Sequence, residues 1–455
     1  MRSLNWMRHE SVLVRLHVSS VFLRWNTWRR GFLHSGGGAC SLGGSAPPPS
    51  PPVVFVHGEK GSPPAAIFVQ EVVPGPKKIS GRIEIRQVIR EEVKVAFFDI
   101  AEDKAPGPDG YSAAFFKAAW PVVGEEMTQA VLEFFQNGRL LKQVNATLFT
   151  LIPKVRAPTT VSDFRPISCC NVLYKAITKI LVSRIKDCLD DLISPTQNVF
   201  VPGRRIGDNV MLAQELFMGY NQQRCALKVD LRKAYDIVEW DFLLEVLRLF
   251  RFSSRFTGWI EECVTKPSYS VCINGEAHRF FRGARGLRQG DPMSPYLFVL
   301  AMELLRGILQ QMISTDPSFQ FHWKCAELGL FQLGFADDLL LFCAADDHSI
   351  GLFQRGLDLF ASLSSLHVNP TKSQLILSKE AIQSGRRYYS SLVFRRVFYL
   401  YVTLVSHSSH LGSLWLLVDL SCKRSMTVSM GGRALLCHLQ LGCNLLSVLM
   451  AINTY

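Results

Sequence analysis

This chain of 455 residues lacks the short motifs of two large enzyme classes. Neither a GxSxG nor a GxxxxGK(S/T) pattern is present, so the sequence supports neither a serine hydrolase nor a phosphate-loop enzyme. Its twelve cysteines include no CxxC pair and no repeated spacing, which argues against a disulfide framework. We therefore expect reduced, mostly buried thiols, as in an intracellular protein.

Long apolar runs and N-terminal acidic residues are also scarce. No uninterrupted apolar run reaches the length of a membrane span, and the best stretch, residues 397–405, is too short, so we expect no membrane association. Residues 1–35 hold six arginines and one acidic residue, Glu10, a balance that resembles an organellar transit peptide but without its serine content. We predict an intracellular location, nuclear or cytoplasmic, with organellar targeting as the less favoured alternative.

The composition that is present indicates a large folded chain with a polyanionic partner. With 48% hydrophobic residues, the chain can bury a core divided into two or three subdomains. A formal charge of +12 and a pI near 9.2 favour nucleic acid as the partner. Many basic proteins bind no nucleic acid, so charge alone does not decide this.

Ordered structure is expected from about residue 83, after a Gly/Ser/Pro-rich linker at residues 36–52. Hydrophobic periodicity predicts helices over 91–100, 112–119, 124–137, 171–192, 208–220, 240–250, 294–313 and 349–364. Asp208-Asn209 is expected to cap the helix that runs to residue 220. Strands are predicted over 146–152, 226–231, 269–273 and 374–377, with a hairpin turn at Asn274-Gly275. This alternation predicts an α+β fold, a small antiparallel sheet with helices on one face.

The most informative segment is Phe335–Asp338, which places two adjacent carboxylates, Asp337 and Asp338, between the apolar runs 328–333 and 339–342. This pattern predicts a β-hairpin with both acids at its tip. Such neighbours repel each other, and a divalent cation would reverse that penalty. The alternative is a solvated turn, because Asp is a common turn residue. A second pair, 346–347, instead precedes a helix and is interpreted as its N-cap.

A third carboxylate is expected from another strand, and Asp230 is the best candidate. It lies within residues 228–236, where an apolar strand ends and a polar turn begins. Two Mg²⁺ ions that share two or three carboxylates can support nucleotidyl transfer. Taken alone, Asp230 is better explained as an ordinary strand-end turn residue.

Several motifs then arrive in a characteristic order. The segments 230–236, 285–295 and 335–338 together resemble the palm motifs of a non-LTR (LINE-type) retrotransposon reverse transcriptase of the plant lineage. Upstream, segments 104–110, 151–154, 163–168 and 200–209 resemble the fingers of that family, and 366–373 resembles its next palm motif. The resemblance covers roughly residues 85–380 and is specific because so many motifs occur in order.

The resemblance implies a right-hand polymerase fold. Residues 1–80 would be a basic N-terminal segment and Gly/Pro-rich linker, expected to be disordered. Residues 81–225 would form the fingers, 226–380 the antiparallel-sheet palm, and 381–455 a degenerate thumb-like remnant. Only faint similarity to the family continues beyond about residue 385.

The implied function is RNA-directed DNA polymerase activity. The partners would be an RNA template, a DNA primer and deoxynucleoside triphosphates, and the cofactor two Mg²⁺ ions, with Mn²⁺ as an alternative. The oligomeric state is left open. A second interpretation is a catalytically inactive remnant that binds RNA or has no activity, and a third is an RNA-binding splicing cofactor of the maturase kind.

The resemblance also assigns roles to individual residues. Asp230, Asp337 and Asp338 would be the catalytic, metal-binding carboxylates. Tyr235 falls where the family has an aromatic steric gate that excludes a 2′-hydroxyl, although a core aromatic is the plainer interpretation. Ile237 departs from the family pattern, in which a small polar residue is common.

The remaining assignments concern the nucleotide and its phosphates. Gln289 and Gly290 match the segment that packs against incoming nucleotide and template, although a turn before a helix would also explain this glycine. Lys154 and Arg165 would hold triphosphate oxygens, with solvated surface charge an equal alternative for Arg165. Lys372 matches a lysine that protonates pyrophosphate.

Overall fold

The computed structural model describes residues 86–217, 224–378, 381, 395–402 and 414–418. The predictions for residues 1–80 therefore lie outside the described residues, as does most of the predicted thumb-like remnant. The first described elements are the helices α3 (Arg90–Phe98), α4 (Ala113–Ala118) and α5 (Trp120–Asn137). Ser112 caps α4 by accepting a hydrogen bond from the Phe115 backbone N–H, and Gly138 ends α5 in a left-handed conformation.

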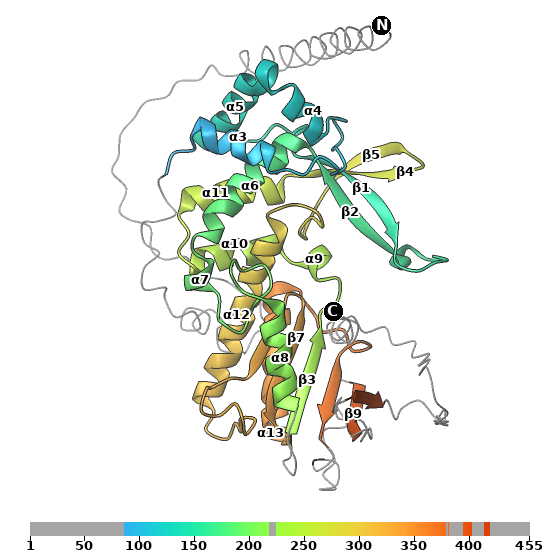
Figure 1. The fold of residues 1–455 in the computed structure, drawn as a ribbon. Coiled ribbons are helices and arrows are strands. Elements are labelled where there is room, and N and C mark those ends of the chain that lie inside the picture. The colour runs from blue at the N-terminus through green and yellow to red at the C-terminus, as the bar shows by residue number, and fades with distance from the viewer. Residues whose placement is uncertain (1–85, 218–223, 379–380, 382–394, 403–413, 419–455) are drawn as a thin grey trace, which may run out of the picture.

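A four-stranded sheet lies beside these helices in the order β2-β1-β4-β5 (Figure 1). It contains β1 (Ala146–Pro153), β2 (Phe164–Cys170), β4 (Ser268–Ile273) and β5 (Glu276–Arg282). The β1–β4 pair is parallel and the other pairs are antiparallel. The predicted hairpin turn is confirmed, because Asn274 and Gly275 both adopt positive φ, 52° and 86°.

A second sheet of six strands has the order β10-β9-β8-β3-β7-β6. Its strands are β3 (Arg224–Asp230), β6 (Gln332–Phe335), β7 (Asp338–Ala344), β8 (Gln374–Leu377), β9 (Arg395–Val402) and β10 (Leu414–Val418). β3 runs antiparallel to both of its neighbours, β7 and β8, whereas β8 and β9 are parallel. Both strands of the predicted hairpin, β6 and β7, thus belong to this sheet.

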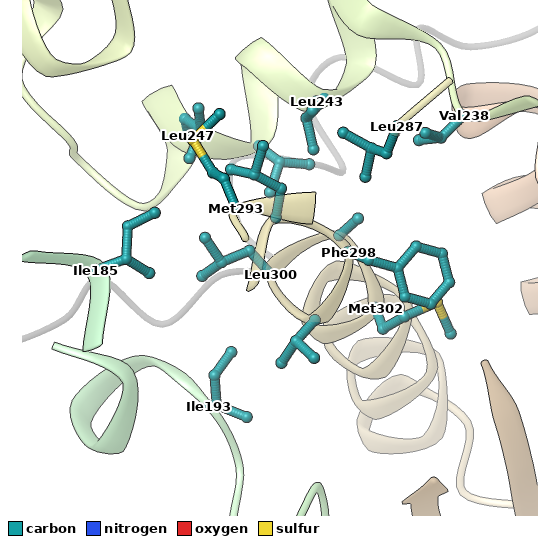
Figure 2. Packing of buried hydrophobic residues seen from close by; sticks show 14 of the residues in the cluster. Ile185, Ile193, Val238, Leu243, Leu247, Leu287, Met293, Phe298, Leu300 and Met302 are labelled. Atoms are coloured by element: carbon teal, nitrogen blue, oxygen red, sulfur yellow. The ribbon is translucent and has the colours of Figure 1, made fainter. Parts of the chain in front are cut away.

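The main core lies around α12 (Ser294–Thr315). Figure 2 shows its Phe298 and Leu300 among apolar side chains that include Leu247 and Ile185. This helix is long and apolar enough to cross a membrane by length and composition, but in the structure it is largely buried by the rest of the chain. The other helices are α6 (Val172–Lys186), α7 (Leu189–Leu192), α8 (Ile206–Phe217), α9 (Ala234–Ile237), α10 (Trp240–Leu249), α11 (Ser254–Thr265) and α13 (Asp347–Ser364), with a short 3-10 turn over Val161–Asp163.

The mixed α+β composition is confirmed, but the predicted single antiparallel sheet with helices on one face is wrong. The described residues form two sheets, each with one parallel pair. On the six-stranded sheet, Leu227 and Leu341 belong to the core around α12, whereas Leu340 and Phe342 form a second cluster with α8. Both faces of this sheet are therefore covered by apolar clusters. The successive apolar residues of β7 agree with this, because such a run is typical of a strand buried on both sides.

Several element boundaries also differ from the predictions. The predicted helix 171–192 is divided into α6 and α7 around Asp187–Cys188. β2, α9 and α11 were not predicted. Pro166 weakens the strand pattern of β2, and it is tolerated because β2 is an edge strand. The interpretation of Asp346 as an N-cap is confirmed, since its carboxylate accepts a hydrogen bond from the Ser349 backbone N–H (2.8 Å).

Candidate active site

The carboxylates at the tip of the β6–β7 hairpin lie directly beside Asp230. Phe335 pairs with Asp338 across a two-residue turn of Ala336 and Asp337. Asp338 is in turn the register partner of Asp230 on β3. Ala336 adopts a φ of 64°, a left-handed conformation that costs about 1 kcal/mol or more in a non-glycine residue. The sequence prediction of a hairpin with both acids at its tip, beside the end of a third strand, is confirmed.

The electrostatics of this corner reflect its excess of negative charge. Burial, with the charge of Asp230 adding to it, raises the pKa of Asp337. Burial also raises the pKa of Asp338 to about 6, helped by the charges of Asp337 and Asp230 and opposed by Lys228. The neighbouring carboxylate charges therefore add to the raised pKa of Asp337 and Asp338, and the surrounding cations oppose that increase only in part.

These carboxylates fit a divalent cation by charge and donor type, since hard oxygen ligands suit Mg²⁺ or Mn²⁺. Within the described residues, no three His, Cys, Asp or Glu side chains are already arranged around a common ion position. Asp230 is turned toward protein partners, because Asn369 Nδ2 donates to its Oδ1 (3.0 Å) and Lys372 Nζ lies 3.8 Å from its Oδ2. The use of Asp230 as a ligand and the identity of the metal stay predictions.

Asn369 is a site residue that the sequence did not single out. Besides its side-chain contact with Asp230, its backbone N–H donates to the Asp230 carbonyl (2.8 Å). Ser373 Oγ accepts from the Asp230 backbone N–H (3.0 Å). Residues 366–373 thus hydrogen-bond both the backbone and the side chain of Asp230. The family-like segment contained this signal, but only the fold identifies Asp230 as the residue that Asn369 contacts.

Tyr235 lies near the hairpin, on the short helix α9. Its ring stacks on Phe298 of α12, with centroids 5.1 Å apart and an interplanar angle of 20°. Burial raises the pKa of its hydroxyl to about 12, and the charge of Asp337 contributes to the increase. The ring is therefore held by the core while its hydroxyl faces the acidic corner. Its role as a steric gate stays a prediction.

The loop that carries Gln289 and Gly290 is fastened to both sides of the site. Gln289 Nε2 donates to Asp236 Oδ1 (3.1 Å), and its carbonyl accepts from the Ser168 backbone N–H (2.7 Å). Gly290 has a φ of 110°, and a Cβ there would lie 3.0 Å from the Ser168 carbonyl oxygen. Glycine is thus required at this position by backbone geometry and by close approach to β2.

A buried arginine next to this loop was also missed. Arg288 is 4% exposed and donates hydrogen bonds to Asn145 Oδ1 (2.9 Å), Tyr174 OH (2.7 Å) and the Cys263 carbonyl. The Tyr174 hydroxyl donates to Asp291 Oδ2 (2.7 Å), which completes a buried polar network. This network connects the loop to α6, α11 and the residue before β1. No pattern in the sequence predicts the burial of an arginine inside a turn-rich segment.

The three cations predicted on the fingers and beside the palm lie around the carboxylates. The charge of Lys154 opposes the burial that raises the pKa of Asp236, and its Nζ donates to the Ser162 carbonyl (2.9 Å). Arg165 is exposed on β2, and its charge acts to lower the pKa of Asp337. Lys372, beside Asp230, has a side chain that is 62% exposed. Arg165 and Lys372 are thus close enough for their charges to act on Asp337, whereas the charge of Lys154 acts on Asp236.

A separate cavity of about 450 Å³ lies where α4 and α5 meet the starts of β1 and β4. Its walls include the rings of Tyr111, Phe115 and Phe280. None of the predicted site residues lines it. The acidic corner is therefore an open site at the tips of strands and is distinct from this apolar cavity.

The two sheets, their helices and the acidic hairpin fit the α+β fold of a nucleic-acid polymerase. The chain belongs to the reverse transcriptase (RNA-dependent DNA polymerase) family, whose family model matches residues 152–402, more than half of the 455 residues. The match includes the hairpin, Asp230 and every other predicted site residue. The prediction of a reverse transcriptase domain is thus confirmed.

Curated relatives come from retrotransposable elements. The chain is 29% identical over 294 residues to an uncharacterized 149 kDa protein of transposon TX1 from Xenopus laevis, which covers 63% of this chain and 22% of the relative. It is 26% identical over 310 residues to a retrovirus-related Pol polyprotein from a type-2 retrotransposable element of Drosophila melanogaster, covering 66% of this chain and 28% of the relative. These matches support the predicted non-LTR class.

A third match is short. An uncharacterized mitochondrial protein of Arabidopsis thaliana is 46% identical over 50 residues, which is 10% of this chain and 41% of that protein. The chain spans only about a quarter of the length of the Xenopus and Drosophila relatives. The family of the domain is therefore established, whereas the activity and partners of the whole protein are proposals.

Proposed function

We propose that this domain catalyses RNA-directed DNA synthesis, with Asp230, Asp337 and Asp338 as its catalytic carboxylates. The observation that carries the proposal is the pairing of Asp230 with Asp338 at the hairpin that also holds Asp337. When bound, two Mg²⁺ ions, or Mn²⁺ as the alternative, supply Lewis-acid activation of the attacking hydroxyl and charge neutralisation at the leaving pyrophosphate. The raised pKa of Asp337 and Asp338 supports a need for cations at this corner.

The proposed substrates are an RNA template, a DNA primer and deoxynucleoside triphosphates. Lys154 and Arg165 would bind triphosphate oxygens, since Lys154, the residue after β1, acts electrostatically on Asp236, and Arg165 on β2 acts on Asp337. Lys372, beside Asp230, would donate a proton to the departing pyrophosphate. Gln289 and Gly290 would position template and nucleotide, and Tyr235 would exclude a 2′-hydroxyl.

We further propose a right-hand architecture, with residues 81–225 as fingers, 226–380 as palm and 381–455 as a degenerate thumb-like remnant. The strands β3, β6, β7 and β8, which surround the carboxylates, would belong to the palm, and the β1–β2 ribbon to the fingers. A plant lineage is proposed on the short similarity to the Arabidopsis protein. We propose an intracellular, nuclear or cytoplasmic location without membrane association, with organellar targeting through residues 1–35 as the alternative.

The test is deoxynucleotide incorporation on an RNA template with Mg²⁺, comparing the purified chain with Asp337→Asn. We expect incorporation by the wild-type chain and a loss of at least about a hundredfold in the variant, because it removes a charge that the cations require. Asn has nearly the same size as Asp, so folding should be preserved.

Equal incorporation by both proteins would exclude a catalytic role for this hairpin. A folded wild-type chain that binds RNA but incorporates nothing would favour the inactive remnant. Splicing assistance without incorporation would favour the maturase-like interpretation.

A further inference from the structure

The strand that leads into the acidic hairpin lies at the edge of its sheet. β6 pairs with β7 on one side, and on the other it meets the segment before α8. Gly334, the residue before Phe335, donates its backbone N–H to the Thr196 carbonyl (2.9 Å). Its own carbonyl accepts a hydrogen bond from Asn209 Nδ2 (3.0 Å). Both backbone polar groups of this edge residue are therefore held from outside the sheet.

Asn209 was expected to cap a helix together with Asp208, and this prediction is wrong. The helix α8 begins earlier, at Ile206, so Asn209 lies within its first turn. Its side chain turns away from the helix and donates to two carbonyls, those of Thr196 (2.8 Å) and Gly334 (3.0 Å). The residue is only 3% exposed. One amide hydrogen thus connects α8 directly to the edge of the sheet at Gly334, and the other holds Thr196, whose carbonyl also accepts from the Gly334 backbone N–H.

The orientation of this amide is fixed by a second asparagine. Asn198 Nδ2 donates to Asn209 Oδ1 (2.9 Å) and to the Arg205 carbonyl (3.0 Å). Close approach adds to the polar contacts, because a Cβ on Gly334 would lie 2.9 Å from Gln197 Nε2. The segment is thus seated against β6 by shape as well as by hydrogen bonds, and the Asn209 oxygen and nitrogen are assigned unambiguously by their partners.

The hairpin needs such an external support. Throughout the part of the chain that the structure describes, no side chain hydrogen-bonds the carboxylates of Asp337 or Asp338. Their positions follow from the backbone of β6 and β7 alone. β3 fixes one side through the Asp230–Asp338 pair. On the other side, the hydrogen bonds of Gly334 and the packing of Leu333 and Phe335 in the cluster with α8 restrain the strand next to the turn, which already contains the strained Ala336.

We propose that Asn209 is a positioning residue for the catalytic hairpin: its amide holds β6 at Gly334 so that Asp337 and Asp338 stay in place beside Asp230. This proposal rests on the proposed function, because the position of the hairpin matters for catalysis only if Asp337 and Asp338 are catalytic carboxylates. It assigns to Asn209 no contact with nucleotide, metal or template. Its effect is transmitted through one strand residue and the two-residue turn.

The test uses Asn209→Asp, which preserves size and the acceptor for Asn198 but removes both donors. The matched control is Thr128→Val, which removes one buried hydrogen bond, from Thr128 Oγ1 to the Gly124 carbonyl (2.6 Å), inside α5. Three quantities are compared in the full chain: amide hydrogen exchange of residues 332–344 without metal, Mn²⁺ binding by electron paramagnetic resonance, and kcat and KM for deoxynucleotide incorporation.

We expect exchange in residues 332–344 to quicken about tenfold in Asn209→Asp, because one buried hydrogen bond to Gly334 on the strand edge and a second one to Thr196, the backbone partner of Gly334, are lost. Mn²⁺ binding should weaken and kcat should fall by about tenfold, with little change in KM for the primer–template. Thr128→Val should change neither exchange in this segment nor kcat. If Asn209→Asp does not fold, Asn198→Ala should shift the same readouts in the same direction by a smaller factor.

Unchanged hairpin exchange and kcat in Asn209→Asp, or equal changes in Thr128→Val, would overturn the proposal. Its failure is distinguishable from failure of the proposed function. Full activity of Asp337→Asn would remove the catalytic assignment and leave the exchange result standing. If the wild-type chain incorporates nothing, hydrogen exchange and Mn²⁺ binding still decide whether Asn209 holds the hairpin.

Discussion

At the scale of single residues, Tyr235 carries the most specific chemical assignment after the carboxylates. Its ring is stacked on Phe298, so its position is set by the core of the domain. In Tyr235→Val the ring is lost and space opens beside Asp337. We expect discrimination against ribonucleotides to fall by about tenfold or more, measured as the ratio of kcat/KM for matched deoxy- and ribonucleotides.

Tyr235→Phe provides the control, because it keeps the ring and removes only the hydroxyl. It should retain most of the discrimination if the ring itself is the gate. A Val variant that discriminates like the wild type would show that Tyr235 is a core aromatic.

At the scale of elements, α12 carries a buried carboxylate that ties it to the segment before α8. Glu303 Oε2 accepts from the Ser194 backbone N–H (3.1 Å), and its side chain is 11% exposed. Burial raises its pKa from 4.5 to about 7, against the opposing charges of Arg306 and Arg204. A raised folded pKa means that this group favours the folded state fully below pH 4.5 and loses that contribution as the pH rises through about 7.

Glu303→Gln should therefore gain stability relative to wild type between about pH 5 and pH 8, since the amide still accepts from Ser194 and never ionises. A pKa difference of this size corresponds to at most about 3 kcal/mol. Denaturant unfolding at about pH 5 and about pH 8 measures this stability difference. Glu133→Gln, at an exposed position on α5, is the control. A stability difference that does not change with pH would contradict the assignment.

The elements also show how far sequence reasoning reaches. The β6–β7 hairpin and the β4–β5 turn were predictable because apolar alternation and Asn-Gly chemistry act over a few residues. The same local logic misassigned Asn209, whose amide serves a strand 125 residues away in sequence. The burial of Arg288 was not predicted for a related reason, because its partners Asn145 and Tyr174 come from distant segments of the chain. Local pattern identifies the ligands of a site, whereas the residues that hold them depend on tertiary contacts.

At the scale of the whole molecule, the acidic corner is bounded by elements of both sheets. Gln289 joins Asp236, after β3, to Ser168 on β2, and Arg288 fastens the same loop to α6 and α11. The hairpin of the six-stranded sheet is likewise held by the segment before α8. The site is therefore assembled by connections between sheets, and a small shift of one sheet relative to the other would separate the carboxylates from Lys154 and Arg165.

The last prediction concerns the net charge of the chain. A charge of +12 should chiefly strengthen the binding of a polyanionic template–primer. Affinity for an RNA–DNA duplex should fall steeply with salt: contact with about six phosphates would lose about a thousandfold between about 50 and 200 mM. Fluorescence anisotropy at several salt concentrations measures the slope. Lys154→Gln should leave this slope unchanged and raise KM for the nucleotide, because the proposal assigns Lys154 to the triphosphate. A wild-type slope near zero would exclude electrostatic duplex binding. A slope reduced by about one in Lys154→Gln would instead mean that Lys154 contacts a phosphate of the duplex and not the nucleotide.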